Sequence, residues 1–211
     1  DRTNVGAESL VYADLRGAHT VGVSTLYNLI YLVRAERVNP QGEIRLVHQS
    51  PAAATLDGGR NLGPVCAERA MRLAIEKARA LGIGWVAVRN SNGLGAASYV
   101  ARMAMEQGMV GICMSNSAPM VAPVHSTARM LGANPLSVAI PAQRREPLIF
   151  DLSTAPITDR ELYWMDGEAQ RVMPGLLQDA LGCPTRDPAT MLRGGAVRPL
   201  GGDMASGGHK G

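Results

Sequence analysis

The sequence predicts an α/β fold, and three observations support that prediction. Short, unbroken apolar runs such as Trp85–Val88 and Val110–Met114 have the length of strands. Longer stretches carry apolar residues at helical spacing, and the clearest of them runs from Pro64 to Gly82. The two kinds of segment alternate along the middle third of the chain, which is typical of helices layered on a sheet.

The elements expected before residue 60 are two helices and a strand. Apolar residues recur on one helical face in two stretches, each ended by glycine or proline. A short alternation of apolar and polar residues then indicates a half-buried strand. In order, we expect helices over Ala7–Leu15 and Gly22–Arg34, a strand over Glu43–Val47, a break over Pro51–Ala54 and a turn over Leu56–Gly59.

From Pro64 onward the pattern predicts strands that alternate with helices. Runs without any polar residue predict strands that are buried on both faces. Beyond Pro156 the sequence is rich in turn residues. The expected elements are a helix from Pro64 to Gly82, a strand at Trp85–Val88, a helix at Ala96–Gln107 and strands at Val110–Met114, Leu136–Ile140 and Leu148–Phe150.

These patterns divide the chain into three expected segments. Residues 1–50 form an N-terminal helical segment with the first strand, residues 51–155 form an α/β core, and residues 156–211 form a turn-rich C-terminal part.

Composition indicates a globular protein and excludes several classes of function. Apolar residues make up 46% and charged residues 18% of the chain. The net charge is +3, but the arginines are scattered among acidic residues and aromatic residues make up only 4%, so we expect no nucleic-acid surface. No apolar run approaches the roughly 18 residues of a membrane span, and no secretory signal layout is visible, so we expect no membrane contact.

Cysteine usage points to a reducing compartment. Cys66, Cys113 and Cys183 are far apart, odd in number and without metal-ligand spacing. We therefore expect free thiols, no metal site and a cytoplasmic location.

The stretch Asn90–Gly95, with the sequence N-S-N-G-L-G, lies between an expected strand and an expected helix. Together with several further segments in the same order, it resembles the malate/L-lactate dehydrogenase family of nicotinamide-dependent oxidoreductases. The segments that carry the resemblance are Asp14–Gly17, Gly22–Val23, Leu56–Gly63, Ala78–Gly95, Ser115–Pro119, Leu131–Pro135, Asp151–Thr154, Pro199–Gly202 and Gly208–Gly211.

The resemblance implies a non-Rossmann α/β fold, a mixed sheet with flanking helices. It also implies NAD or NADP as cofactor, a small-molecule substrate and a homodimer. The glycines agree with a non-Rossmann fold, because the nearest candidate for a dinucleotide fingerprint, Gly82-Ile83-Gly84, precedes a strand instead of following one. Family members are longer at both ends, so this chain is either a shortened homologue or part of a longer protein.

The chain departs from the family at positions where the resemblance places chemistry. The family's S-N-H-x-G has its histidine where this chain has Gly93. In the family's S-H-G-V-x-R, the histidine is replaced by Val21 and the arginine by Thr25. We expect these three positions, with Ala118, to line the substrate pocket. The pocket then lacks the usual acid/base and the usual clamp for a carboxylate, which favours a ketone, imine or alcohol without the 2-hydroxy acid group. A purely structural interpretation of Gly93 is that it permits a sharp loop.

Two histidines are candidates for a relocated acid/base. His19 lies two residues before Val21, and His125 lies in the segment that matches the family's P-x-G-G, next to the expected path of the cofactor and beside Ser126. A histidine can exchange a proton near neutral pH. The simpler alternative is that both are ordinary exposed loop histidines.

Residues for cofactor binding are carried over from the resemblance. They follow expected strands, where hydroxyls and backbone N–H groups can reach ribose and pyrophosphate, and a lysine adds charge. The same residue types also serve in turns and caps. The expected cofactor-binding residues are Asn116, Ser117, Asn134, Asp151, Leu152, Ser153 and Lys210.

The sequence leaves two functional hypotheses open. The first is an NAD(P)-dependent oxidoreductase whose substrate and proton donor have diverged. The second is a catalytically degenerate or repurposed family member that acts as a binding or scaffold protein, or in a non-redox reaction. Retention of the cofactor positions favours the first hypothesis, and the changes at Val21, Thr25 and Gly93 favour the second.

Overall fold

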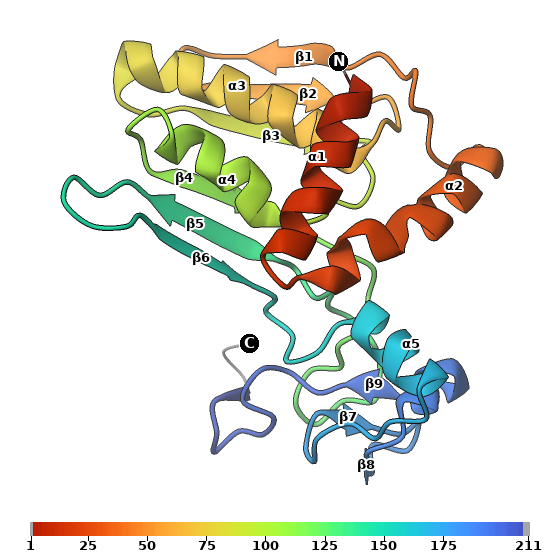
Figure 1. Ribbon diagram of the computed structural model, residues 1–211. Coiled ribbons are helices and arrows are strands. Elements are labelled where there is room, and N and C mark those ends of the chain that lie inside the picture. The colour runs from red at the N-terminus through yellow and green to blue at the C-terminus, as the bar shows by residue number, and fades with distance from the viewer. Residues whose placement is uncertain (1, 209–211) are drawn as a thin grey trace. The chain divides into compact units, whose positions relative to one another are not determined.

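The computed structural model describes residues 2–208 (Figure 1). Contacts divide the chain into two compact units that interleave along the sequence. Unit 1 contains the residues up to Cys113 together with Ser137–Asp151, and unit 2 contains Met114–Leu136 together with the residues from Leu152 onward. The three-segment division at residues 50 and 155 stays a prediction.

Unit 1 consists of helices packed on small sheets. Three of its strands begin or end with one residue that belongs to unit 2. Its helices are α1 (Arg2–Leu15), the 3-10 turns η1 (His19–Val21) and η2 (Val23–Thr25), α2 (Leu26–Arg34), α3 (Gly63–Leu81) and α4 (Ala97–Met105). Its strands are β1 (Arg45–Gln49), β2 (Ala53–Asp57), β3 (Trp85–Arg89), β4 (Gly111–Met114), β5 (Leu136–Ile140) and β6 (Leu148–Leu152).

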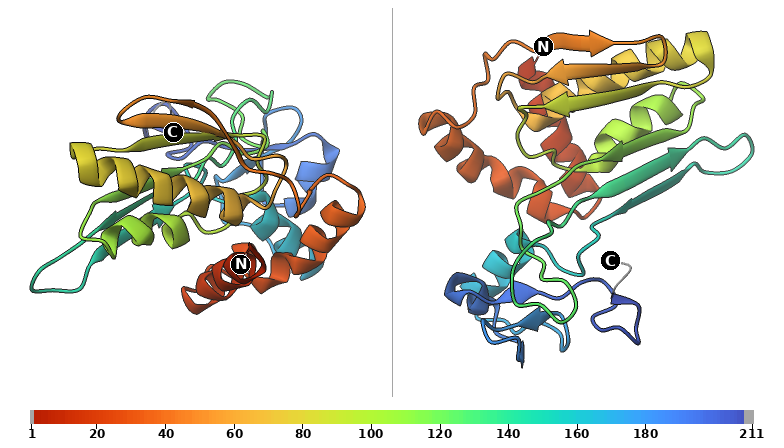
Figure 2. Two further views of the ribbon diagram at one scale, coloured as in Figure 1. Left: turned by 90° about the horizontal axis from the view of Figure 1, so that it is seen from above. Right: turned by 180° about the vertical axis from the view of Figure 1, so that it is seen from behind.

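The sheet β1-β2-β3 is mixed. Strand β1 runs antiparallel to β2, with a register shift between Leu46 and His48, and β2 runs parallel to β3 with Asp57 opposite Arg89. The strands β4, β5 and β6 form a second sheet in that order. Helix α3 lies along one face of β1-β2-β3, as the front and back views show (Figures 1 and 2). The α/β class, with a mixed sheet and flanking helices, is confirmed.

Unit 2 is built around short strands and turns. Its elements are α5 (Asp159–Gly167), the strands β7 (Leu177–Gln178), β8 (Pro184–Thr185) and β9 (Ala196–Val197), and the 3-10 helix η3 (Pro188–Arg193). The strands form a sheet in the order β8-β7-β9, in which β7 is antiparallel to both neighbours.

Each unit has its own apolar cluster. In unit 1, the rings of Tyr12 and Tyr99 meet edge to face at 5.7 Å, and the guanidinium of Arg102 lies 4.7 and 5.2 Å from their centroids. We call the set Tyr12, Ala13, Ala96, Tyr99 and Val100 the tyrosine cluster. The cluster of unit 2 comprises Met120, Val121, Ala133, Ala155, Ile157, Leu162, Val172, Leu177 and Val197.

Several predicted elements agree closely with the structure. Strand β5 has the predicted bounds, and α3 has Pro64 in its first turn and ends at Gly82. Gly82 adopts φ 82°, a left-handed conformation that favours glycine after a helix. Helix α2 begins at Leu26 instead of Gly22, because the preceding residues form the turns η1 and η2.

The predicted break and turn over residues 51–59 were wrong for their central part. Residues Ala53–Asp57 form strand β2, whose Ala54 and Leu56 are buried. Parallel pairing with β3 and burial on one face outweigh the low strand propensity of alanine.

The prediction that β3 and β4 are buried on both faces was also wrong within this chain. Trp85 is 54% and Ile112 is 48% exposed. Helix α3 packs on one face of β3 only, so alternate residues of that strand stay accessible.

Helix α5 was missed, because the sequence after Pro156 reads as turn-rich. It begins with a capping box, in which the hydroxyl of Thr158 accepts from the Glu161 N–H and the Glu161 carboxylate accepts from the Thr158 N–H. The spacing T-x-x-E is the signal that could have identified it.

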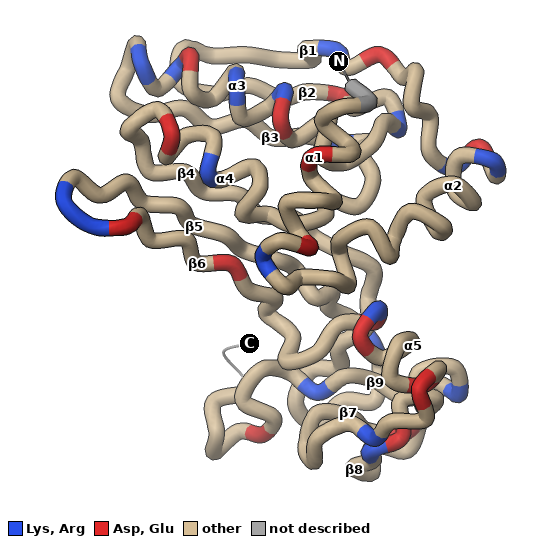
Figure 3. The backbone as a smooth tube through the Cα atoms, in the orientation of Figure 1, with Lys and Arg blue, Asp and Glu red and all other residues tan. Residues whose placement is uncertain are grey.

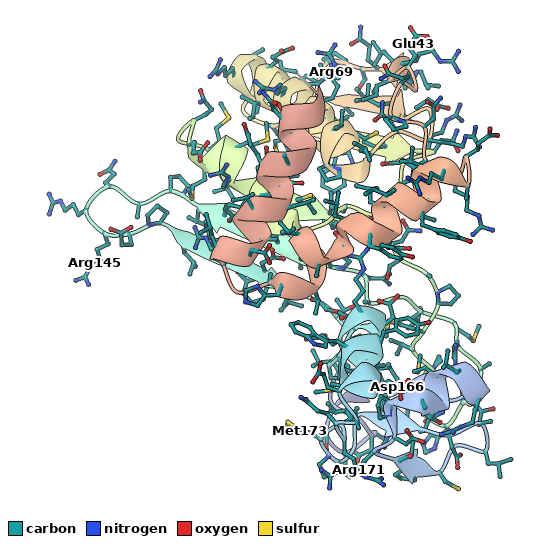
Figure 4. The ribbon with its side chains drawn as sticks, turned by 45° about the vertical axis from the view of Figure 1, so that its right-hand side comes forward. Glu43, Arg69, Arg145, Asp166, Arg171 and Met173 are labelled. Atoms are coloured by element: carbon teal, nitrogen blue, oxygen red, sulfur yellow. The ribbon has the colours of Figure 1, made fainter. Side chains whose placement is uncertain are left out.

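Charged residues of both signs are interspersed in both units (Figure 3). Arg145 projects from the loop that joins β5 to β6, and Asp166 and Arg171 lie in unit 2 (Figure 4). No helix within residues 2–208 is long and apolar enough to cross a membrane. Over the same residues, no group of histidine, cysteine, aspartate and glutamate is arranged to hold a metal ion.

Candidate functional site

The loop Asn90–Gly95 starts at the end of β3 and is fixed there by a carboxylate from β2. Asp57 is 7% exposed, and its Oδ2 accepts hydrogen bonds from Asn90 Nδ2 at 2.8 Å and Arg89 Nε at 3.2 Å. Its Oδ1 accepts from the Gly59 N–H at 3.0 Å. Because β2 and β3 are parallel neighbours, both strands end at the same edge and a single side chain reaches both ends.

These hydrogen bonds shift the acidity of Asp57. The Gly59 N–H, followed by the Asn90 amide and then Arg89, lowers the pKa of the Asp57 carboxyl below its ordinary value. The group is therefore ionised at neutral pH, and it acts as an acceptor for all three donors.

The middle of the loop is held by a second set of contacts. Asn92 Nδ2 donates to the backbone oxygens of Arg60, at 2.7 Å, and Asn61, at 3.0 Å. A Cβ at Gly63 would lie 2.1 Å from the backbone oxygen of Gly93, so the start of α3 touches the loop where only glycine fits. Gly93 itself is exposed, which agrees with a structural interpretation of that position.

The segment 16–25 joins α1 to α2, and we call it the early loop. It brings Val21 to the tyrosine cluster. Val21 is half-buried against this cluster, and Leu94, the neighbour of Gly93, packs on the same cluster. The structure therefore brings together the surroundings of both positions at which the resemblance places histidines. Thr25 is half-buried, and its hydroxyl donates to the backbone oxygen of Gly22 at 2.8 Å, a contact within its own turn.

His19 has a carboxylate partner in the same loop. Its Nδ1 lies 3.0 Å from Asp14 Oδ1, and Asp14 Oδ2 accepts from the Val23 N–H at 2.9 Å. The Val23 N–H, followed by the His19 ring, lowers the pKa of the Asp14 carboxyl. The His19 side chain is 56% exposed, so its ring remains accessible.

Asp151, an expected cofactor residue, lies at the start of α4. Its Oδ2 accepts from the Ser98 N–H at 2.9 Å, so a negative charge is placed at a helix N-terminus. The nearby Cys113 thiol has its pKa raised to about 12, by burial first and by the charge of Asp151 second. Cys113 is therefore a packing residue rather than a thiolate nucleophile.

Unit 2 brings three of the expected cofactor residues together. The Ser117 N–H donates to Asn134 Oδ1 at 3.0 Å, and the Asn134 N–H donates to Ser117 Oγ at 3.3 Å. The Ser153 hydroxyl donates at 2.9 Å to the backbone oxygen of Ala133, the residue before Asn134. Loops 115–119, 131–135 and 152–154 therefore meet in one place.

The remaining expected residues of unit 2 have weaker contacts. Asn116 and Ala118 are exposed, and Leu152 is half-buried. His125 is exposed with φ 64°, and its ring has no hydrogen bond within residues 2–208. Ser126 does not hold it, because the Ser126 hydroxyl accepts from the Ala128 N–H. Lys210 lies outside the described residues.

Asp14 and Asp57 were missed as loop-organising residues. Asp14 stands in the matching segment Asp14–Gly17 and Asp57 in Leu56–Gly63, so the resemblance marks both positions without saying what they contact. Their partners are distant in sequence or lie across a loop, and no periodicity reveals them.

A family model described as malate/L-lactate dehydrogenase matches residues 1–211. The chain belongs to the malate/L-lactate dehydrogenase family. Among similar proteins, the malate dehydrogenase of Pyrococcus abyssi is 42% identical over 97% of this chain and 57% of that protein. The L-sulfolactate dehydrogenase of Methanocaldococcus jannaschii is 35% identical over 96% of this chain and 58% of that protein.

Solved structures of the family support the same assignment. The crystal structure of malate dehydrogenase from Entamoeba histolytica has a TM-score of 0.95 and 30% identity, and the match covers 99% of this chain and 60% of that chain. The chain thus spans less than two thirds of the length of these relatives. The fold expected from the resemblance is confirmed, and the relatives are dehydrogenases.

The Asp57 contacts predict a pH-dependent stability. A lowered pKa in the folded state stabilises the fold above the unfolded value of about 4, and this contribution is lost as the pH falls through the folded pKa. Asp57→Asn should therefore be less stable than the unchanged chain at neutral pH and should lose less stability on acidification. Urea unfolding at neutral and acidic pH measures both effects.

The matched control for this experiment is Asp166→Asn. Asp166 is exposed on α5, and its carboxyl makes no hydrogen bond within residues 2–208. It should leave the urea midpoint at neutral pH unchanged. Equal midpoints for Asp57→Asn and the unchanged chain would contradict the role given to Asp57.

Proposed function

We propose that the chain belongs to an oxidoreductase that uses NAD or NADP and has an altered active site. Its substrate is a ketone, imine or alcohol that lacks the usual 2-hydroxy acid group. The observation that carries the proposal is the meeting of loops 115–119, 131–135 and 152–154, which gathers Ser117, Asn134 and Ser153. The dehydrogenase names of the relatives support the reaction class.

The residues present fit a nicotinamide dinucleotide mainly through backbone N–H groups that have no partner among the described residues. The polar groups of Ser117, Asn134 and Ser153 bond to one another's loops, so they shape the backbone. Hydrogen bonds among the described residues account for the Ser117 N–H but not for those of Asn116 and Ala118. These N–H groups and the exposed Asn116 amide are donors of the kind that pyrophosphate and carboxamide oxygens need.

Other residues would contribute to holding the cofactor. The Asp151 carboxylate is the acceptor that a ribose hydroxyl needs, Leu152 offers apolar contact, and Lys210 would add positive charge for the pyrophosphate. When bound, the nicotinamide ring gives or takes the hydride. No cysteine among residues 2–208 forms a disulfide, and we propose a cytoplasmic location.

The exchange of the substrate proton is assigned to His19 in preference to His125. Proton transfer needs a side chain with a fixed geometry and a matched acidity. His19 is held by a carboxylate at 3.0 Å, whereas the His125 ring has no hydrogen bond among residues 2–208. Both residues are exposed.

The residues at the pocket positions favour a substrate without a carboxylate. Val21 packs against an apolar cluster, and the Thr25 hydroxyl is occupied by the Gly22 oxygen. Gly93 has no side chain, and Ala118 offers a methyl group. A carboxylate held without a cation at these positions would lose hydration without compensation.

A second candidate is a repurposed binding or scaffold protein. The observation that favours it is that Val21 packs on the tyrosine cluster and the Thr25 hydroxyl donates to the Gly22 oxygen. Neither side chain therefore needs a substrate as a contact partner. Binding of a nicotinamide dinucleotide separates the two candidates, because the scaffold candidate requires none.

We predict that the chain binds NADH or NADPH and that Lys210→Ala weakens this binding. Loss of one charge-assisted hydrogen bond costs about 1.5–3 kcal/mol, which is roughly a tenfold to hundredfold increase in Kd. Isothermal titration calorimetry with each cofactor measures the effect. Lys77→Ala is the matched control, because Lys77 is the other lysine of the chain and donates to the backbone oxygens of Ser50 and Pro51 instead. If neither NADH nor NADPH gives heat at millimolar concentration, the result favours the scaffold candidate.

We also predict that malate and lactate are not oxidised. Gly93 provides no base for the hydroxyl, and Thr25 provides no charge for the carboxylate. The assay follows NAD(P)H absorbance with malate, lactate and, in the reverse direction, cyclohexanone and pyrroline. Turnover of malate or lactate by the unchanged chain would refute the substrate proposal.

Finally, we predict a homodimer with its pocket at the subunit boundary. Helix α2 has large apolar residues that are well exposed, among them Tyr27 at 86% and Tyr31 at 62%, and such surface is typical of interfaces. Light scattering should return about twice the 22.3 kDa mass of one chain. A monomer mass at micromolar concentration would show that the apolar surface is not covered by a second copy.

A further inference from the structure

One carboxylate joins the end of α1 to the two 3-10 turns that come after it. Asp14 is near the end of α1, His19 begins η1 and Val23 begins η2. Asp14 Oδ1 lies 3.0 Å from His19 Nδ1, and Asp14 Oδ2 accepts from the Val23 N–H at 2.9 Å. Both oxygens are therefore used, and the carboxylate has a fixed orientation toward the ring.

The loop has a specific space for this carboxylate. A Cβ at Gly22 would lie 2.2 Å from Asp14 Oδ1, so a side chain at that position would displace the group that contacts His19. The Ser24 hydroxyl donates to the backbone oxygen of His19 and so joins η2 to η1. The Asp14 side chain is 31% exposed and that of His19 is 56% exposed, so the partner is the more enclosed of the two.

The carboxylate determines which ring nitrogen carries the proton. The pKa of the Asp14 carboxyl is lowered, mainly by the Val23 N–H, so the group is ionised at neutral pH and can only accept hydrogen bonds. A neutral His19 next to it must have its proton on Nδ1. Its Nε2 then has a free lone pair, and no hydrogen bond within residues 2–208 occupies it.

We propose that Asp14 is a positioning residue that holds neutral His19 as the Nδ1–H tautomer, so that Nε2 is the base of the reaction. This inference rests on the proposed function. In the oxidation direction, a bound oxidised nicotinamide would accept a hydride from the substrate carbon, the C–O bond would become C=O, and Nε2 would take the hydroxyl proton. In the reduction direction, a bound reduced nicotinamide would supply a hydride to the carbon of the C=O or C=N bond, and protonated Nε2 would give its proton to the oxygen or nitrogen.

The arrangement matters for chemistry more than for stability. An exposed ion pair contributes little to folding, because solvent screens it. Fixing a tautomer is a different effect, since an imidazole with its proton on the outward nitrogen cannot act as a base there.

The test replaces Asp14 by asparagine. If the asparagine oxygen accepts from the Val23 N–H, its NH₂ group faces His19 Nδ1, which must then accept, and the ring proton moves to Nε2. Long-range proton–nitrogen NMR of histidine-labelled protein, at a pH where the imidazole is neutral, reports the tautomer directly. His19→Gln identifies the His19 signals. Ser24→Ala is the matched control, because it removes a contact of the same turn and leaves Asp14 in place.

The expected result is an Nδ1–H tautomer in the unchanged chain and in Ser24→Ala, and an Nε2–H tautomer in Asp14→Asn. Asp14→Asn should also lower kcat for cyclohexanone or pyrroline by about 10²–10⁴-fold, the usual contribution of a positioned acid/base. Its Kd for NADH or NADPH should not change, which separates a loss of proton transfer from a loss of fold.

Three results would overturn the proposal. They are an Nε2–H tautomer in the unchanged chain, an unchanged tautomer in Asp14→Asn, and a changed tautomer with unchanged kcat. Failure of the proposed function is recognised separately, because an unchanged chain that neither binds a nicotinamide cofactor nor turns over these substrates removes the catalytic role of His19. The NMR measurement needs no cofactor and still shows whether Asp14 fixes the ring.

Discussion

The carboxylate of Asp57 is the contact on which the candidate loop of unit 1 depends. It joins the ends of two parallel strands and the turn at Gly59 through hydrogen bonds of 2.8–3.2 Å. Asn90 adopts φ 51°, a conformation that few residues other than glycine and asparagine accept, and its side chain bonds to Asp57. Removal of the carboxylate would therefore free both the start of the loop and the residue whose backbone turns it. The contacts of Asn92 and Gly63 fix the rest of the path.

The residues at the positions where the resemblance places histidines, Val21 and Gly93, fit the packing around them. Val21 and Leu94 both pack on the tyrosine cluster, so an apolar side chain at position 21 adds to a contact that the fold already makes. A group that can exchange a proton lies two residues earlier, at His19, where Asp14 reaches it. In the proposed function, packing and proton exchange are thus divided between neighbouring residues of one short loop.

Elements with strong local patterns were predictable from the sequence, whereas elements and contacts that depend on distant partners were not. Helix α3 and strand β5 have strong periodicity or clear breaks, and their bounds agree with the structure. Strand β2 was missed, because its alanines gain strand structure only from pairing with β3. The resemblance placed Ser117 and Asn134 in one site, and the structure brings them together. The roles of Asp14 and Asp57 could not be derived from spacing, because hydrogen bonds across a loop produce no periodic pattern in the sequence.

The distribution of charge in unit 1 bears on the substrate that we propose. Arg89 is paired with Asp57, and the guanidiniums of Arg16 and Arg102 lie over the Tyr12 ring at 5.4 and 4.7 Å. Arg102 is also paired with Glu106, so these cations already have partners in the fold. Asp14 is ionised beside His19, and its negative charge would repel an approaching carboxylate. A neutral carbonyl, imine or alcohol would meet no such repulsion, and in the proposed function it would exchange its proton with His19. The substrate preference that we propose from Thr25 would thus be reinforced by the charge of Asp14.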